Sequence, residues 1–159
     1  MKLEFSAIPT AHARALQAGG PDAYGRPAER TVSDGGGNPC RHCLREIPAG
    51  AGMLIAAYRP FGAAQPYAET GPIFLCEAPC ERYRDETGRL PPLFARRAHL
   101  LVRGYDAAER IVYGTGRVVA VADCEAAVTE TLAAPRVAFV HLRSATNNCY
   151  QARAGRAEG

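Results

Sequence analysis

The chain has 159 residues, of which 47% are hydrophobic, 22% charged and 8% aromatic, as in globular rather than disordered or fibrous proteins. This length fits one domain of ordinary size, so we expect a single domain over residues 1–159. The net charge of +3 is small. We expect no nucleic-acid partner, because nucleic-acid-binding proteins carry stronger and more clustered basic surfaces.

The N-terminal sequence MKLEFSAIPT lacks the apolar run of a signal peptide, and no stretch reaches the roughly 18 apolar residues of a membrane span. These observations predict a cytoplasmic protein without a membrane partner. Six cysteines in a reducing compartment favour metal binding, catalysis or core packing over disulfides. The sequence does not indicate an oligomeric state.

The first third of the chain contains two predicted elements and a long loop. Alternating apolar and polar residues over 2–7 predict a short strand, and Thr10 is a candidate N-cap for a helix that ends near Ala18. Residues 19–39 are rich in Gly, Pro, Asp and Arg. We expect an irregular surface segment there.

Short apolar runs in the middle of the chain, at residues 53–58 and 73–76, predict strands that are buried on both faces. The segment between them contains prolines and glycines without a regular period, which predicts ordered loops. The charged residues 81–89 predict one exposed helical turn.

The C-terminal part predicts three strands within residues 99–102 and 111–121, with a hairpin turn at 114–116, and a last strand at 137–142. Asp123 is the candidate N-cap of a helix with the sequence DCEAAVTETLAA. We therefore expect an α+β fold with a mixed, mostly antiparallel sheet, the C-terminal helix on one face, and long ordered loops. No glycine-rich phosphate-binding motif occurs.

The spacing of four cysteines is the clearest chemical feature. Cys40 and Cys43 form a CxxC pair, and Cys76 and Cys80 form a CxxxC pair. Two short chelating arms of this kind can place four thiolates about 2.3 Å from one tetrahedral zinc ion. The 32 residues between the arms exceed the spacing of compact zinc ribbons. We predict a structural zinc site formed by these four residues.

Two other interpretations of the cysteines stay open. Cys76 and Cys80 can be small packed side chains, with no metal involved. Cys40 and Cys43 can instead cycle through a disulfide, although the surrounding sequence lacks the long helix that follows the CxxC motif of thioredoxin-like proteins. His42 is expected to point outward or to bond to nearby backbone. The remaining cysteines are expected to be packed thiols: Cys124 and Cys149.

Amphipathic side chains on the predicted loops form a second candidate site. Tyr58, Arg59, Tyr67 and Glu69 could hold an anionic small molecule in an enzyme or a binding protein. The alternative is that the tyrosines pack the loops onto the sheet while Arg59 and Glu69 form an ion pair. The sequence assigns no catalytic residue, so whether the protein is an enzyme is left open.

Several sequence blocks together resemble a bacterial family known as domain-of-unknown-function family 1203. The resemblance covers nearly the whole chain and implies a small standalone bacterial protein. It implies no activity and no catalytic residue. The blocks are the following: PCRHCL at 39–44, YRPF at 58–61, PYAE at 66–69, GPIF at 71–74, Cys80, and NCY at 148–150.

Overall fold

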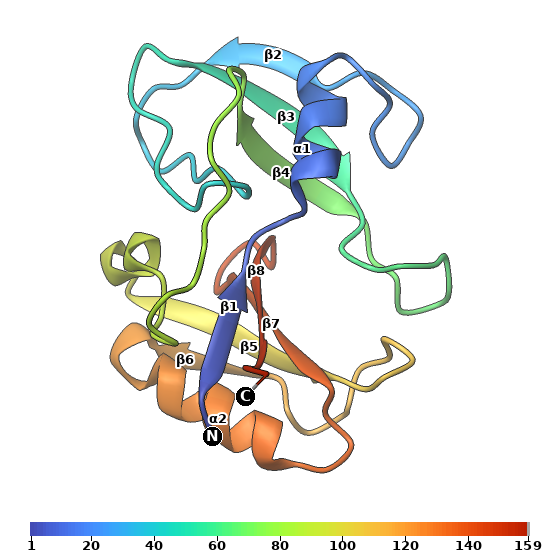
Figure 1. The fold of residues 1–159 in the computed structure, drawn as a ribbon, viewed down its shortest axis with the longest axis vertical. Helices are drawn as coiled ribbons and strands as arrows, with labels where there is room; N and C mark the ends of the chain where they lie inside the picture. The colour runs from blue at the N-terminus through green and yellow to red at the C-terminus, as the bar shows by residue number, and fades with distance from the viewer. Residues whose placement is uncertain (159) are drawn as a thin grey trace. The chain divides into compact units, whose positions relative to one another are not determined.

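The structure is a computed structural model that describes residues 1–158 (Figure 1). The chain divides into two compact units, each formed by separate segments. Unit 1 contains Met1–Ser6, Phe61–Ala68 and the chain from Arg84 onward, whereas unit 2 contains Ala7–Pro60 and Glu69–Tyr83. The strands of both sheets are antiparallel and helices are few, which confirms the predicted α+β class. The expectation of a single domain stays a prediction.

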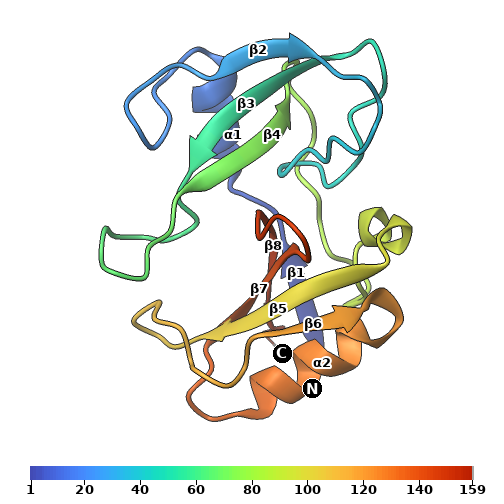
Figure 2. The same cartoon turned by 180° about the vertical axis from the view of Figure 1, so that it is seen from behind.

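Unit 1 contains a five-stranded sheet with the order β1-β8-β7-β5-β6 (Figures 1 and 2). The first strand of the chain pairs with the last one, so that Leu3 lies opposite Arg156. A bulge between Leu142 and Arg143 shifts the register of the β7-β8 pair. The strands are β1 (Leu3–Ser6), β5 (His99–Tyr105), β6 (Arg117–Ala120), β7 (Phe139–Ser144) and β8 (Tyr150–Arg156).

Helix α2 (Cys124–Ala133) packs on one face of this sheet against β5 and β7, as the sequence predicts. The helix ends before Ala134, because residues that precede a proline, here Pro135, disfavour the helical conformation. Asp123 occupies the N-cap position but makes no side-chain capping bond. The first turn of α2 is therefore stabilised by packing rather than by a cap.

The opposite face of the sheet carries an aromatic cluster around His141. Gly104 of β5 faces α2, so the alternation along the strand directs Tyr105 to the other face. The rings of Tyr105 and Phe61 lie 4.6 Å and 5.2 Å from that of His141. Burial, followed by the charge of Arg143, lowers the pKa of His141, so its ring is neutral. His141 thus packs within the core of unit 1.

Unit 2 contains a three-stranded sheet with the order β2-β3-β4, together with helix α1 (Figure 1). The central strand buries Met53, Leu54 and Ala56, whereas all four side chains of β2 are exposed. The N-cap of helix α1 is Pro9 and the helix begins at Thr10, so the prediction of Thr10 as the N-cap was wrong. The elements are α1 (Thr10–Gln17), β2 (Glu29–Val32), β3 (Gly52–Tyr58) and β4 (Gly71–Cys76).

Three sequence-based expectations about strands were wrong. The segment 19–39, predicted to be irregular, contains β2. Residues 111–113 form only an isolated bridge from Ile111 to Tyr105, so the predicted pair of strands in 111–121 is reduced to β6. Strand β8 follows the strand that was expected to be last. Each difference arises where pairing with a neighbour, rather than a hydrophobic pattern, decides the conformation.

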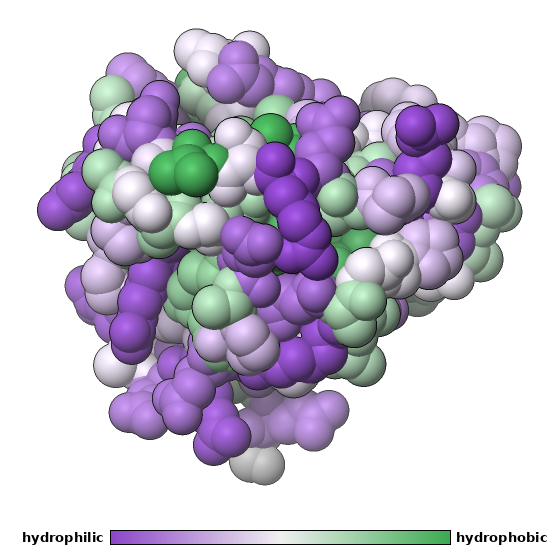
Figure 3. Space-filling view, turned by 90° about the horizontal axis from the view of Figure 1, so that it is seen from above, coloured by the Kyte–Doolittle hydropathy of each residue, from purple (hydrophilic) through white to green (hydrophobic). Residues whose placement is uncertain are grey.

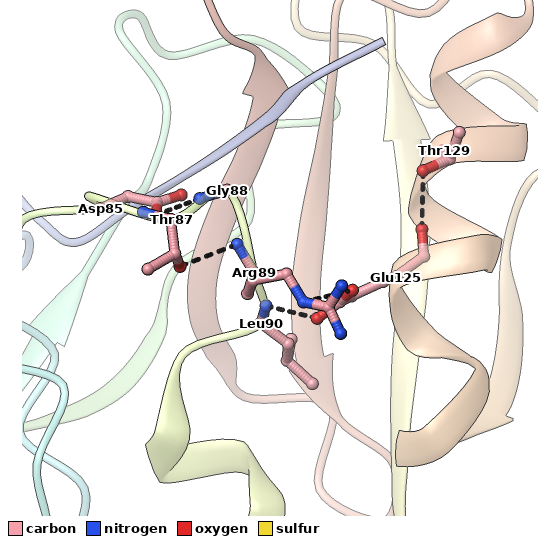
Figure 4. Close-up of polar contacts among 7 residues, drawn as sticks. All are labelled: Asp85, Thr87, Gly88, Arg89, Leu90, Glu125 and Thr129. Atoms are coloured by element: carbon pink, nitrogen blue, oxygen red, sulfur yellow. Dashed lines mark hydrogen bonds and ion pairs between the residues drawn. The ribbon is translucent and has the colours of Figure 1, made fainter.

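The predicted helical turn at 81–89 was also wrong, because side-chain acceptors hold the second part of this segment as a loop (Figure 4). Asp85 accepts the backbone N–H of Gly88 at 2.7 Å. Glu125 on α2 accepts the backbone N–H of Leu90 at 2.8 Å. These bonds satisfy backbone groups that a helical turn would otherwise pair internally. The nearest helical segment is a 3-10 helix at Pro92–Arg96.

Across residues 1–158, no helix combines the length and the apolar character that a membrane crossing requires. Polar and apolar residues are interspersed on the face of the molecule seen in Figure 3. No broad, strongly hydrophobic patch dominates that face, so it does not resemble an extended apolar docking surface.

Candidate metal centre

The four cysteines come from two segments of unit 2 that lie side by side. Cys40 and Cys43 belong to the loop between β2 and β3, whereas Cys76 ends β4 and Cys80 follows it. A parallel bridge pairs Cys40 with Phe74, and the backbone N–H of Arg41 donates to the carbonyl oxygen of Phe74 at 3.0 Å. Backbone pairing therefore brings the CxxC loop to the end of β4, where the CxxxC pair begins.

The sulfur atoms of these residues form a compact cluster, and all four lie within 4.8 Å of one another. The Sγ atoms of Cys40 and Cys80 are 3.8 Å apart, and those of Cys43 and Cys76 are 4.0 Å apart. Four ligands about 2.3 Å from a tetrahedral ion would be separated by about 3.8 Å. The cysteines are free thiols, and these separations far exceed a disulfide bond. The cluster could therefore hold one metal ion.

Backbone N–H groups point at the sulfur atoms of the CxxC loop. The N–H of Cys76 donates to Cys40 Sγ at 3.3 Å, and the N–H of Cys43 also donates to this sulfur. The N–H of Arg45 donates to Cys43 Sγ. Leu44 has a left-handed conformation with φ of 50°, which closes the turn. Such donors stabilise negative charge on the thiolates that a metal would need.

Hydrogen bonds within the cluster favour the thiolate form of Cys40 over that of the other three cysteines. Hydrogen bonds from the Cys43 and Cys76 thiols lower the pKa of Cys40, and the same bonds raise the pKa of Cys43 and of Cys76. Burial, together with the charge of Cys40, raises the pKa of Cys80 to about 12. Three protons are therefore retained near neutral pH. A bound cation would displace them by stabilising all four thiolates.

His42, inside the CxxC loop, lies between the cluster and α1 rather than pointing outward as expected. Its side chain is fully buried. Its Nδ1 atom is 3.2 Å from Cys80 Sγ, and its Nε2 atom is 2.9 Å from the hydroxyl of Thr10. Burial lowers the pKa of His42, which favours the neutral ring. Sequence reasoning missed this role because the spacing of a CxxC loop does not fix the direction of its central side chains.

Helix α1 contacts the second arm of the cluster through two polar side chains. Arg14 donates to the carbonyl oxygen of Cys80 at 2.7 Å, and Gln17 donates to that of Cys76 at 2.9 Å. Arg14 also donates to the side-chain oxygen of Gln17 at 2.8 Å, as expected for residues three apart on a helix. These bonds fix the backbone that carries Cys76 and Cys80.

The other two cysteines belong to unit 1 and lie outside the cluster. Cys124 is buried at the start of α2, and burial raises its pKa to about 12. Cys149 is half-buried, and its sulfur donates weakly to the carbonyl oxygen of Asn147 at 3.7 Å. Both positions agree with the packed thiols that the sequence predicts.

The residues of the predicted ligand site are divided between the two units. Tyr58, Arg59 and Glu69 belong to unit 2, and Tyr67 belongs to unit 1. The Tyr58 hydroxyl lies 3.4 Å from Nδ1 of His12, and burial raises the pKa of Tyr58 to about 12. The Tyr67 hydroxyl hydrogen-bonds to that of Tyr113 at 3.0 Å. Ligand binding by these residues stays a prediction.

A pocket of about 250 Å³ lies in unit 1, and none of the candidate site residues predicted from the sequence lines it. Its lining combines backbone from both terminal segments with acidic side chains. The lining residues are Lys2, Leu3, Glu4, Asp85, Gly88, Ala157 and Glu158.

Two small antiparallel sheets and a cluster of four thiols define an α+β protein with a candidate metal centre. The family model described as "Protein of unknown function (DUF1203)" matches residues 37–156, and the chain belongs to this family. The matched range contains all four clustered cysteines and begins after α1. The family resemblance found in the sequence is confirmed. No curated protein and no solved structure matches the chain.

Proposed function

We propose that Cys40, Cys43, Cys76 and Cys80 bind one structural zinc ion, which links the CxxC loop to the end of β4. The observation that carries this proposal is the separation of the sulfur atoms, 3.8 Å and 4.0 Å for the two opposed pairs. These values match the edges of a tetrahedron with metal–sulfur bonds of about 2.3 Å. The backbone N–H groups that donate to the sulfur atoms of Cys40 and Cys43 further support a site for thiolates.

Zinc is the metal that this ligand set favours. Soft thiolate ligands in a tetrahedral arrangement suit Zn²⁺ or an iron–sulfur centre, and they disfavour hard cations such as Mg²⁺ and Ca²⁺. Four protein ligands close the shell and leave no position for a water molecule that could be activated. The proposed role of the ion is therefore structural rather than catalytic.

The proposed ion would stabilise a part of unit 2 that has little regular structure. The CxxC loop closes on itself through a bridge between Pro39 and Glu46, and one bridge from Cys40 to Phe74 and a few backbone hydrogen bonds join it to its surroundings. Because the loop and β4 are far apart in sequence, a metal bridge would remove much of the conformational freedom of the unfolded chain. Metal binding energy would then contribute directly to the stability of unit 2.

Elemental analysis of protein purified without chelator tests the proposal. We expect one zinc per chain, and release of zinc together with the four thiols of the cluster when the protein is denatured, in addition to the buried thiol of Cys124. A strong chelator should lower the melting temperature. Absence of bound metal, with six thiols that react independently, would contradict the proposal.

The double variant Cys124→Ala/Cys149→Ser provides a matched control, because both residues lie outside the cluster. It should bind one zinc per chain and lose only two of the titratable thiols. Loss of zinc in this variant would show that the metal is bound elsewhere.

One observation favours a second candidate function, thiol redox chemistry. Cys40 is the thiol whose pKa is lowered, by hydrogen bonds from Cys43 and Cys76, and Cys80 lies 3.8 Å from it. A two-electron oxidant such as hydrogen peroxide would join the Cys40 thiolate to the Cys80 thiol. The sulfur atoms lose two electrons and one proton, and the peroxide becomes water and hydroxide. Mass spectrometry of peroxide-treated, metal-free protein should then find a Cys40–Cys80 disulfide that cytosolic reductants reverse.

A further inference from the structure

We propose that His42 is a positioning residue of the metal site, donating its Nδ1–H to the metal-bound sulfur of Cys80 while Thr10 fixes the ring through Nε2. This inference rests on the proposed metal-binding function and extends it beyond the four ligands. Thr10 is the first residue of α1 and contacts the ring of His42. Helix α1 would therefore become part of the metal site through this contact.

The distances define a continuous chain of three groups. Cys80 Sγ lies 3.2 Å from Nδ1 of His42, which is short for a contact involving sulfur. On the other side of the ring, Nε2 lies 2.9 Å from the Thr10 hydroxyl. The ring is fully buried, so each of its nitrogen atoms takes its partner from the protein.

The chemistry of a metal-bound thiolate decides the direction of these bonds. A thiolate has no proton to donate, so a hydrogen bond between Cys80 and His42 requires the proton on Nδ1. In the neutral ring Nε2 then accepts a hydrogen bond that the Thr10 hydroxyl donates, whereas in the charged ring Nε2–H donates to that hydroxyl. The metal-loaded site therefore requires a proton on Nδ1 of His42.

His42 supplies Cys80 with the kind of support that backbone N–H groups give to the first arm. Cys40 Sγ accepts the N–H of Cys76 at 3.3 Å, and Cys43 accepts the N–H of Arg45. Cys80 follows β4 in a segment without regular secondary structure, and its carbonyl is held by Arg14. The bond from His42 therefore orients the sulfur, while the bond from Arg14 orients the backbone of the same residue.

Two substitutions of His42 separate the hydrogen bond from the packing of the ring. His42→Leu removes the donor and keeps an apolar side chain of similar bulk. His42→Asn is smaller but can place its amide N–H near the position of Nδ1. We expect zinc affinity, measured by competition with a chromophoric chelator, to fall about tenfold to a hundredfold in His42→Leu. His42→Asn should recover most of this loss.

Thr10→Val keeps the ring in place and removes only the hydroxyl, so it tests the second bond without changing His42. We expect a smaller loss of zinc affinity than in His42→Leu. The double variant Thr10→Val/His42→Leu should bind zinc no more weakly than His42→Leu alone, because Thr10 acts through the ring. Additive losses would overturn the role given to Thr10.

Nitrogen-15 NMR of the zinc-loaded wild-type protein reads the tautomer directly. We expect His42 to carry its proton on Nδ1. A proton on Nε2 alone, or an Nδ1 atom bound to the metal, would overturn the inference even if zinc is present. Wild-type zinc binding with an unchanged affinity in His42→Leu would also overturn it, while leaving the four-cysteine site intact. A wild-type protein that binds no metal would overturn both.

Discussion

The two compact units differ in what fills their interiors. Across residues 1–158, every buried Phe and Tyr side chain belongs to unit 1, whereas the buried core of unit 2 is aliphatic and includes Cys40. Aromatic side chains bury about 150–250 Å² each, so unit 1 can be stabilised by apolar burial around α2 and its aromatic cluster. The buried aromatic residues are Phe5, Phe61, Phe94, Tyr105, Phe139 and Tyr150.

Unit 2 is stabilised by a different combination of interactions. All side chains of β2 are exposed, and the CxxC loop is held by isolated bridges. Small domains with limited cores often require a metal or disulfides for stability. The proposed metal site would therefore add stability to the unit whose buried core lacks aromatic side chains. Changes to the cysteine cluster and changes to the core of unit 1 should therefore affect different units.

The largest effect is expected from Cys43→Ser, which removes one ligand of the proposed ion. Structural zinc sites provide about 10–16 kcal/mol of apparent binding energy in small zinc-finger peptides, and this energy also stabilises the fold. Hydrogen exchange should show loss of protection in β3 and β4, with protection retained in β5 and β7. Cys149→Ser is the control. Equal loss of protection in both sheets would show that the proposed ion does not stabilise unit 2 more than unit 1.

Acidification should weaken metal binding more than it weakens unit 1. Neighbouring thiols and burial raise the pKa of Cys43, Cys76 and Cys80, so all three are protonated near neutral pH, whereas hydrogen bonds from Cys43 and Cys76 lower the pKa of Cys40. Bound zinc would displace at least these three protons, so its affinity should fall by about a thousandfold or more for each pH unit lowered. Chelator competition at several pH values measures this slope. A slope near zero would contradict displacement of protons from the cluster.

In unit 1, Leu132→Ala should be destabilising by about 2–5 kcal/mol, because the side chain is fully buried on α2 and a cavity would remain. Denaturant unfolding measures the change in the free energy of unfolding. Hydrogen-exchange protection of β5 and β7 shows whether the change lies in unit 1. The zinc content should not change. Leu132→Met, which nearly conserves volume, should cost less than about 1.5 kcal/mol. Zinc loss in Leu132→Ala would show that the two units are energetically coupled.

A smaller effect is expected where β5 meets α2. A Cβ atom on Gly104 would lie 3.0 Å from Cγ2 of Thr131 and 3.1 Å from Cγ2 of Val137, which requires local displacement. Gly104→Ala should therefore be destabilising by about 1 kcal/mol. Gly155→Ala on β8 is the matched control, since a Cβ there meets nothing within 4 Å. The melting temperature, measured by thermal unfolding, should decrease for Gly104→Ala and stay unchanged for Gly155→Ala.

Much of the fold and the pairing of the cysteines could be predicted from local patterns. Apolar runs located β3 and β4, and the DCEAAVTETLAA segment located α2. The two cysteine pairs were expected to meet because short spacings of this kind make chelating turns. Each element and each cysteine pair depends on residues close together in sequence, which is why the sequence was sufficient for them. The meeting of the two pairs depends instead on the backbone bridge between Cys40 and Phe74, which are distant in sequence.

The remaining features depend on partners that are distant in sequence. Strand β8 has the sequence YQARAGR, whose arginines and glycine do not indicate a strand, but it is paired on both sides by β1 and β7. Strand β2 is exposed and pairs only with β3. His42 is directed by Thr10 and Cys80, which lie 32 and 38 positions away along the chain. Spacing rules contain no information about such contacts.

The pairing of β1 with β8 gives the two units a different order of completion during protein synthesis. The sheet of unit 1 includes β8, so it is complete only after residues 150–156 have left the ribosome. Unit 2 ends at Tyr83, and all four clustered cysteines precede that point. Nascent domains fold as soon as their own segments emerge. Metal supply would therefore act on the growing chain, well before the strand that closes unit 1 has been translated.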